Sequence, residues 1–157
     1  VYGFGFSLQW KAFDLSAFFQ GVAHVSFSTL PDQTQAFVGR NLKESSVFAD
    51  LYGNTWTPEN PGAKYPRMTT GAIDNNNQLS TFWMANGRYL RLKNLELGYT
   101  LPKRIANKIA MQSLRVYLSG VNLFTFSPFK LWDPDLQTGA TNYPNNRIIN
   151  LGLTIGF

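Results

Sequence analysis

The chain has 157 residues, of which 44% are hydrophobic, 15% aromatic and 15% charged, and its formal net charge is +5. Soluble domains typically carry ~25% charged residues, so part of this surface is expected either to face something other than water or to be covered by Ser, Thr, Asn, Gln and Gly. The basic residues are spread from Lys11 to Arg147, which argues against a nucleic-acid partner; the absence of Cys excludes disulfides and thiolate metal sites.

The first two predicted strands, residues 2–10 and 13–22, form a hairpin. In residues 2–10, aromatic and Leu side chains alternate with Gly, Ser and Gln, which is the period of a half-buried strand. Residues 13–22 repeat the alternation after only two residues, 11–12. A connection this short indicates a tight antiparallel turn.

The third predicted strand, residues 87–101, changes phase part-way along. Leu90 and Leu92 share one parity, whereas Leu95, Leu97 and Tyr99 share the other. One extra residue near Lys93 and Asn94 would place all five side chains on one face. The sequence therefore predicts a β-bulge at this point.

The last two predicted strands are residues 113–123 and 147–157, and the connections between strands alternate in length. Residues 11–12 and 102–112 are short connections, whereas residues 23–86 and 124–146 are long. Short periplasmic turns and long extracellular loops are typical of outer-membrane barrels. We expect the two sets to have these locations.

The strand face opposite the apolar side chains favours a barrel over a soluble β-sandwich. This face carries mostly Gly, Ser, Gln, Asn and Thr, which suit a crowded polar lumen, and we expect strand charges such as Arg91, Glu96 and Arg115 to face it. Aromatic residues also gather near strand ends, as in the interfacial girdles of barrels. The girdle candidates are Tyr2, Trp10, Phe13, Tyr89 and Tyr99.

Five strands are too few to close a membrane barrel, which needs at least about eight. An open edge in lipid would leave backbone polar groups unsatisfied. We therefore expect the chain to be the C-terminal part of a larger protein. The apparent start in mid-strand and the absence of a signal peptide agree with this expectation.

The closing stretch "NLGLTIGF" matches the C-terminal pattern of barrels that the outer-membrane assembly machinery inserts. A polar residue is followed by Gly two positions later and by hydrophobic and aromatic residues at the fifth and seventh positions. An unpaired last strand can be captured by strand addition. The predicted assembly signal consists of Asn150, Gly152, Ile155 and Phe157.

Four segments resemble one family closely. They are "WTPENPGAKYPR", "GRYLRLKNLELGYTLP", "LRVYLSGVNLFTF" followed by "DPD", and the ending "NLGLTIGF". On these residues the chain is similar, over essentially its whole length, to the SusC/RagA group of TonB-dependent outer-membrane transporters from Bacteroidetes.

The resemblance implies an all-β fold in which this chain supplies five antiparallel strands of a plugged barrel of about 22 strands. It also implies an integral outer-membrane location and TonB-powered import of oligosaccharides or peptides. A SusD-like surface lipoprotein would close the extracellular side. The plug and the segment that contacts TonB are not part of residues 1–157.

Little in the sequence indicates catalysis, a cofactor or a metal site. His24 is the sole histidine and lacks partners spaced for a triad. Loop aromatics surrounded by polar residues offer substrate or lid contacts, or alternatively pack the loops together. These candidates are Trp56, Tyr65, Trp83 and Trp132, with Asp133 and Asp135, which also suit a simple turn around Pro134.

The sequence thus predicts a transporter component and not an enzyme. The alternative from another class is a secreted carbohydrate-binding β-sandwich module, which the alternating loop lengths and Phe157 disfavour. A siderophore receptor or an outer-membrane enzyme is a third reading, disfavoured only by the family motifs at Trp56 and Tyr89.

Overall fold

The computed structural model describes residues 1–29, 49–69, 73, 75–76, 78–137 and 142–157. They divide into two units. The sheet unit comprises Val1–His24, Arg88–Ser127 and Asn145–Phe157, and the loop unit comprises Val25–Gly87 and Pro128–Pro144. No helix in the described ranges combines the length and the hydropathy that crossing a membrane requires.

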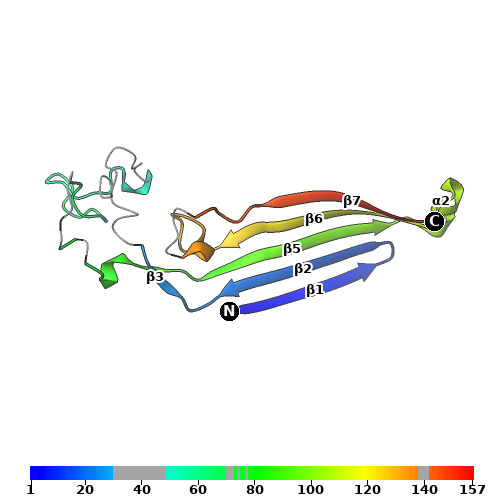
Figure 1. Ribbon diagram of the computed structural model, residues 1–157, viewed down its shortest axis with the longest axis horizontal. Coiled ribbons are helices and arrows are strands. Elements are labelled where there is room, and N and C mark those ends of the chain that lie inside the picture. Colours follow the sequence, from blue (N-terminus) through cyan, green and yellow to red (C-terminus); the bar gives the residue numbers. More distant parts are fainter. Residues whose placement is uncertain (30–48, 70–72, 74, 77, 138–141) are drawn as a thin grey trace. The chain divides into compact units, whose positions relative to one another are not determined.

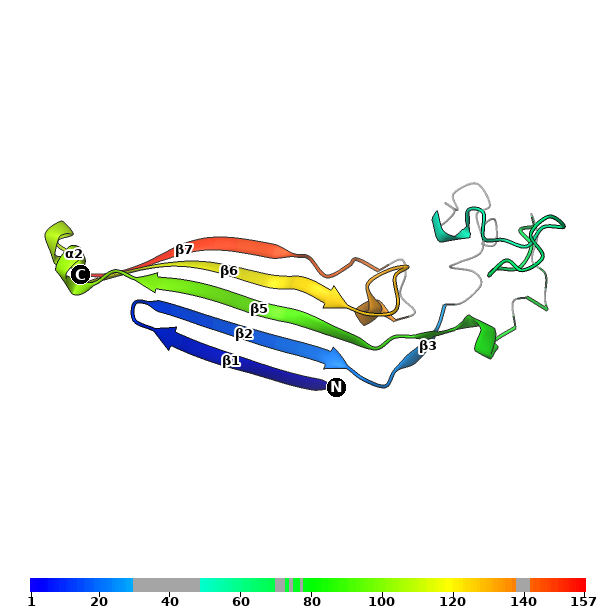
Figure 2. The same cartoon turned by 180° about the vertical axis from the view of Figure 1, so that it is seen from behind.

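The sheet unit is a five-stranded antiparallel sheet in the order β1-β2-β5-β6-β7, with neighbouring strands side by side (Figures 1 and 2). This confirms the all-β prediction with five antiparallel strands. The strands are β1 (Tyr2–Trp10), β2 (Phe13–Val22), β5 (Tyr89–Thr100), β6 (Ser113–Phe126) and β7 (Ile148–Gly156).

The predicted bulge lies in β5. Phe18 and Phe19 of β2 pair with Asn94 and Leu92, so Lys93 is the extra residue. The insertion brings Leu90 and Leu92 onto the face that carries Leu95, Leu97 and Tyr99. The strand β6 has a further register shift opposite the same point and continues to Phe126, beyond the expected end at residue 123.

One face of the sheet is predominantly apolar, because the cross-strand register aligns apolar residues of neighbouring strands in the same rows. Leu8, Leu15, Leu97, Leu118 and Leu151 form one row across all five strands. The outer members of this row are well exposed, at 60% for Leu8 and 76% for Leu151. A β-sandwich would bury such a face.

Tyr89 was wrongly expected in the aromatic girdle. The bulge places its side chain on the polar face, where it is buried, with Arg91 over the ring at 5.4 Å. The local alternation already indicates this position, because Tyr89 shares the parity of Arg91 and not that of the apolar Leu90 and Leu92.

The short connections and the C-terminal residue lie at one end of the sheet (Figure 1). The turn at Lys11 and Ala12 joins β1 to β2, and α2 (Lys103–Ala106) with the 3-10 helix η3 (Asn107–Ile109) joins β5 to β6. Pro102 directly precedes α2, and its restricted φ suits the start of a helix.

The loop unit contains a short sheet within residues 23–86, the range predicted as an extracellular loop. Strands β3 (Ser26–Ser28) and β4 (Met84–Asn86) form a two-stranded antiparallel sheet. These strands are too short to show periodicity. Single 3-10 turns complete the unit: η1 (Ala49–Leu51), η2 (Thr81–Trp83) and η4 (Pro134–Leu136).

Candidate functional site

The core of the loop unit is built from Leu51, Tyr65 and Trp83, all less than 9% exposed. The chain around Tyr65 is held by backbone hydrogen bonds: Trp56 N–H donates to the Tyr65 carbonyl, and Tyr65 N–H donates to the Asn54 carbonyl, both at 2.9 Å. The Trp83 indole Nε1–H donates to the Asn76 carbonyl at 2.9 Å. Tyr65 and Trp83 therefore pack the unit together.

A charged cluster lies beside this core. The Lys64 Nζ donates to Asp50 Oδ2 at 2.7 Å, and the Tyr65 hydroxyl donates to the same oxygen at 2.5 Å. These hydrogen bonds lower the pKa of Asp50, and the bond to Asp50 raises the pKa of Lys64. Burial, reinforced by the bond to Asp50, raises the pKa of Tyr65. The Lys64 Nζ also lies over the Tyr65 ring, 4.6 Å from its centroid.

We expect the Asp50 contacts to stabilise the loop unit at neutral pH and to be lost in acid. A lowered folded-state pKa contributes stability above the unfolded value, about 4, and loses it as pH falls through the folded value. The raised pKa values of Lys64 and Tyr65 contribute fully below about 10 and are lost as pH rises further.

The stability difference between the natural protein and Asp50→Asn should therefore be flat from about pH 5 to pH 9 and shrink in acid. Hydrogen-exchange protection factors over residues 50–65 of the intact protein measure this difference, because they are normalised to the intrinsic exchange rate at each pH. A difference that grows below about pH 4 would contradict the assignment.

A pocket of about 480 Å³ opens onto the core and the charged cluster. Its volume is in the range typical of small-molecule sites, about 300–1,000 Å³. All of its lining residues belong to the loop unit. The charged and aromatic side chains of its lining are Asp50, Lys64, Tyr65, Phe82, Trp83, Phe129 and Lys130.

A second aromatic group joins the two chain segments of the loop unit. Phe129 packs edge-on against Phe27 and Trp132, with ring centroids 5.0 and 4.7 Å apart. The Trp132 indole Nε1–H donates to the Gln137 carbonyl at 2.7 Å. These contacts hold residues 128–137 against β3.

Asp133 caps a 3-10 turn. Its Oδ1 accepts a hydrogen bond from the Asp135 N–H at 3.0 Å, and Pro134 occupies the first position of η4. In the described part of the chain, no group of three or more His, Asp or Glu side chains is arranged to hold a metal ion. The interpretation of residues 133–135 as a simple turn around Pro134 accounts for these contacts.

The structure brings only two of the six predicted loop residues to the pocket, Tyr65 and Trp83. Trp56, which is 38% exposed, Trp132, Asp133 and Asp135 do not line it. Sequence reasoning missed Asp50, Lys64 and Lys130, because no periodicity or motif connects these positions. The one available signal was that Lys64 lies inside the "WTPENPGAKYPR" segment.

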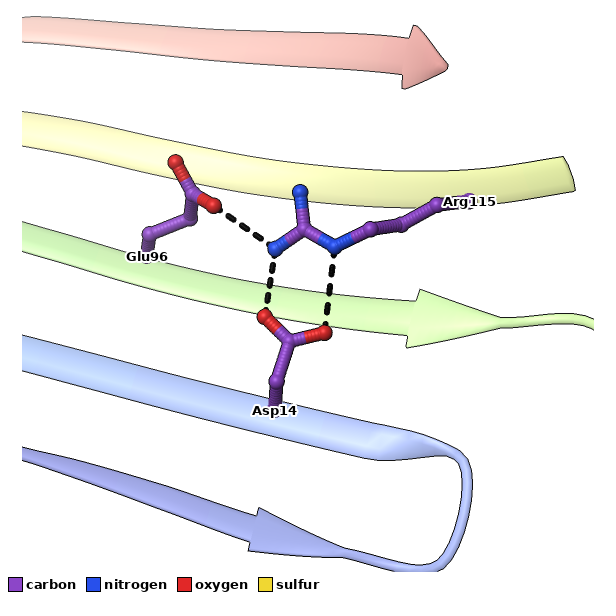
Figure 3. Close-up of polar contacts among 3 residues, drawn as sticks. All are labelled: Asp14, Glu96 and Arg115. Carbon is purple, nitrogen blue, oxygen red and sulfur yellow. Dashed lines mark hydrogen bonds and ion pairs between the residues drawn. The ribbon is translucent and has the colours of Figure 1, made fainter. Parts of the chain in front are cut away.

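The polar face of the sheet carries an ion-pair network across three strands (Figure 3). From β6, the Arg115 side chain reaches across β5 to Asp14 on β2, donating from both Nε and Nη2 to the two carboxylate oxygens. Nη2 also donates to Glu96 Oε1 at 2.7 Å. Glu96 and Arg115 therefore share the polar face of the sheet and pair across neighbouring strands, with Asp14 as a third member.

Two glycines leave room for the large side chains of this face. Tyr117 lies directly opposite Gly98 on β5 and Gly152 on β7. A Cβ atom at Gly98 would collide with the Arg115 guanidinium and the Asp14 carboxylate, and one at Gly152 would collide with the Tyr117 ring. Arg115 in turn lies over that ring, 5.0 Å from its centroid.

The four residues of the predicted assembly signal lie in or next to β7. Asn150 pairs with Ser119, Gly152 with Tyr117 and Ile155 with Leu114, whereas Phe157 directly follows the strand. Asn150 and Gly152 are on the polar face, and Ile155 is on the apolar face. The recognition of these residues by assembly machinery stays a prediction.

Comparison with known proteins shows which class of protein contains a similar sheet. No family model matches the chain. The chain is 33% identical over 169 residues to TonB-dependent receptor P3 of Formosa agariphila, covering 99% of this chain and 16% of that protein. It is also 31% identical over 170 residues to receptor P26 of that organism, covering 100% and 17%.

Solved structures give the same result. The chain matches the RagAB peptide importer in its open-open and closed-closed states, each with a TM-score of 0.73, at 28% and 29% identity. Each match covers 99% of this chain and 17% of that one. Over essentially its whole length, the chain is therefore similar to TonB-dependent receptors of the SusC/RagA group.

These TonB-dependent receptors are outer-membrane β-barrel proteins. The match excludes the soluble β-sandwich alternative. The chain spans about a sixth of the length of the curated relatives it matches. Those relatives are receptors and importers, which agrees with a protein that is not an enzyme.

Proposed function

We propose that this chain is the C-terminal segment of the barrel of a TonB-dependent importer. The complete barrel would have about 22 strands. In this arrangement residues 11–12 and 102–112 are periplasmic turns, and residues 23–86 and 124–146 are extracellular loops. The observation that carries the proposal is the match of essentially the whole chain to RagAB with a TM-score of 0.73. The loop unit then lies on the side from which nutrients arrive.

Peptides are the favoured substrates, and oligosaccharides are the second class. The matched structures are described as those of a peptide importer. Oligosaccharide stacking on a flat ring is supported chiefly by Trp56, which is partly exposed in the loop unit. The other two tryptophans of the predicted set use their indole N–H groups within the fold.

The partners follow from the same placement. A SusD-like surface lipoprotein would cover the extracellular loops, and TonB would act through an N-terminal region outside residues 1–157. Outer-membrane lipid covers the apolar face, and the barrel-assembly machinery would recognise β7. The proposal includes no nucleic acid and no cofactor.

We expect deletion of the intact gene in its host to abolish uptake of its substrate, and depletion of TonB to do the same. Uptake of fluorescently labelled oligopeptides and oligosaccharides by whole cells measures this effect, with re-expression of the intact gene as the control. A tag on an extracellular loop should also co-purify a SusD-like lipoprotein from detergent extracts. Unchanged uptake of both classes would contradict the importer function.

A further inference from the structure

The charges around the loop-unit pocket do not balance. The lining includes two cationic side chains, Lys64 and Lys130, and one carboxylate, Asp50. Asp50 already accepts hydrogen bonds from Lys64 and Tyr65. Among the described residues no carboxylate pairs with Lys130, which is exposed. The pocket therefore presents a net positive charge to its ligand.

Most of the remaining lining of the pocket is apolar. Its apolar members include Phe82, which is 57% exposed, Met84, Phe129 and Leu131. A ligand that satisfies both parts carries an anionic group beside an apolar group. Lys130 neighbours Phe129 and Leu131 in the chain, so the uncompensated cation and the apolar wall are adjacent.

The ring faces at this site favour a peptide over a sugar. Sugar rings stack on exposed flat faces, but Trp83 is only 4% exposed and packs edge-on against Phe82. The Tyr65 ring is covered by the Lys64 ammonium group at 4.6 Å. An apolar side chain of a peptide can fill the space along Phe82 and Phe129 without a flat stacking surface.

We propose that this pocket binds a peptide through an acidic side chain, which pairs with Lys130 and Lys64, and through a neighbouring apolar side chain, which packs on Phe82 and Phe129. The proposal rests on peptide import as the proposed function and adds a charge preference to it. Lys130 determines that preference, because Lys64 is already shared with Asp50.

The test uses the intact transporter purified in detergent with its lipoprotein. An equimolar mixture of three tetrapeptides, identical except for Glu, Gln or Lys at one position beside a Leu, is added, and the retained peptides are quantified by mass spectrometry. We expect the natural protein to retain the Glu peptide about tenfold over the Lys peptide, as for one charge-assisted contact.

Lys130→Glu should reverse this preference, because it converts the uncompensated cation into an anion. The side chain is exposed, so the substitution should leave folding unchanged. Lys103→Glu makes the same charge change on α2, in the sheet unit, and should keep the natural preference.

Three results would overturn the proposal, and they separate it from the proposed function. Equal retention of the three peptides by the natural protein would leave peptide import standing and remove the charge preference. A Glu preference that survives in Lys130→Glu would place the recognition elsewhere. Retention of a glucuronate-containing oligosaccharide, added in a parallel incubation, with no retention of any peptide would overturn both peptide import and this use of the pocket.

Discussion

Replacing Arg115 by Leu is expected to remove most of the folded barrel from the outer membrane. Arg115 is the cation that Asp14 and Glu96 both contact, and its loss leaves two carboxylates facing each other across neighbouring strands. Cold electrophoresis of outer-membrane fractions, in which a folded barrel migrates ahead of the heat-unfolded chain, measures the folded fraction.

Two variants make this result specific to the network. Arg104→Leu is the same change on exposed helix α2 and should leave the folded fraction unchanged. Arg115→Lys keeps the charge but loses the planar fork that reaches two carboxylates, so it should be intermediate. Equal folded fractions for Arg115→Leu and Arg104→Leu would show that the network does not stabilise the barrel.

Gly98→Val should cause the same defect by another route, because its side chain would occupy the space of the Arg115 guanidinium. Combined with Arg115→Leu it should add little, since both changes remove one network. Ser119→Val is the matched control. It adds a β-branched side chain on the same face, opposite Glu96, and should be tolerated.

Replacing Trp83 by Ala is expected to unfold the loop unit while the barrel stays folded. The indole is buried with Leu51 and Tyr65, and removing it should cost about 3–5 kcal/mol of local stability. The Asn76 carbonyl also loses its donor. Hydrogen exchange over residues 51–65 of the intact transporter should accelerate by about 100-fold or more.

Phe82→Ala provides the matched control in the same 3-10 turn. Phe82 is 57% exposed, so its truncation should cost less than about 1 kcal/mol. Cold electrophoresis should show the barrel folded in both variants. Similar exchange rates in Trp83→Ala and Phe82→Ala would mean that Trp83 is not the core of the loop unit.

Strand positions were readable from the sequence because alternation has a local cause. Successive side chains of a strand point to opposite faces, so the apolar set of β1 and β2 is visible within ten residues. The bulge at Lys93 was equally visible, because an inserted residue reverses the phase of the alternation.

The loop residues show where local reasoning stops. Tyr65 and Trp83 were singled out as aromatic residues in polar surroundings, but nothing in the sequence distinguished them from Trp56, which lies outside the pocket. The pocket draws its lining from separate segments near residues 50, 64, 82 and 130. No periodic pattern links such positions, so their chemistry emerges only in three dimensions.

By itself, the sequence of this protein determined the strands, the apolar face, the bulge and, through its motifs, the family. Only the tertiary structure decided the partners of its charges: Arg115 reaches Asp14 across 101 positions of sequence, and Lys64 pairs with Asp50 beside a buried core. The physical reason is that strand periodicity arises from each residue's own backbone, whereas an ion pair depends on the register of strands and loops that are distant in the chain.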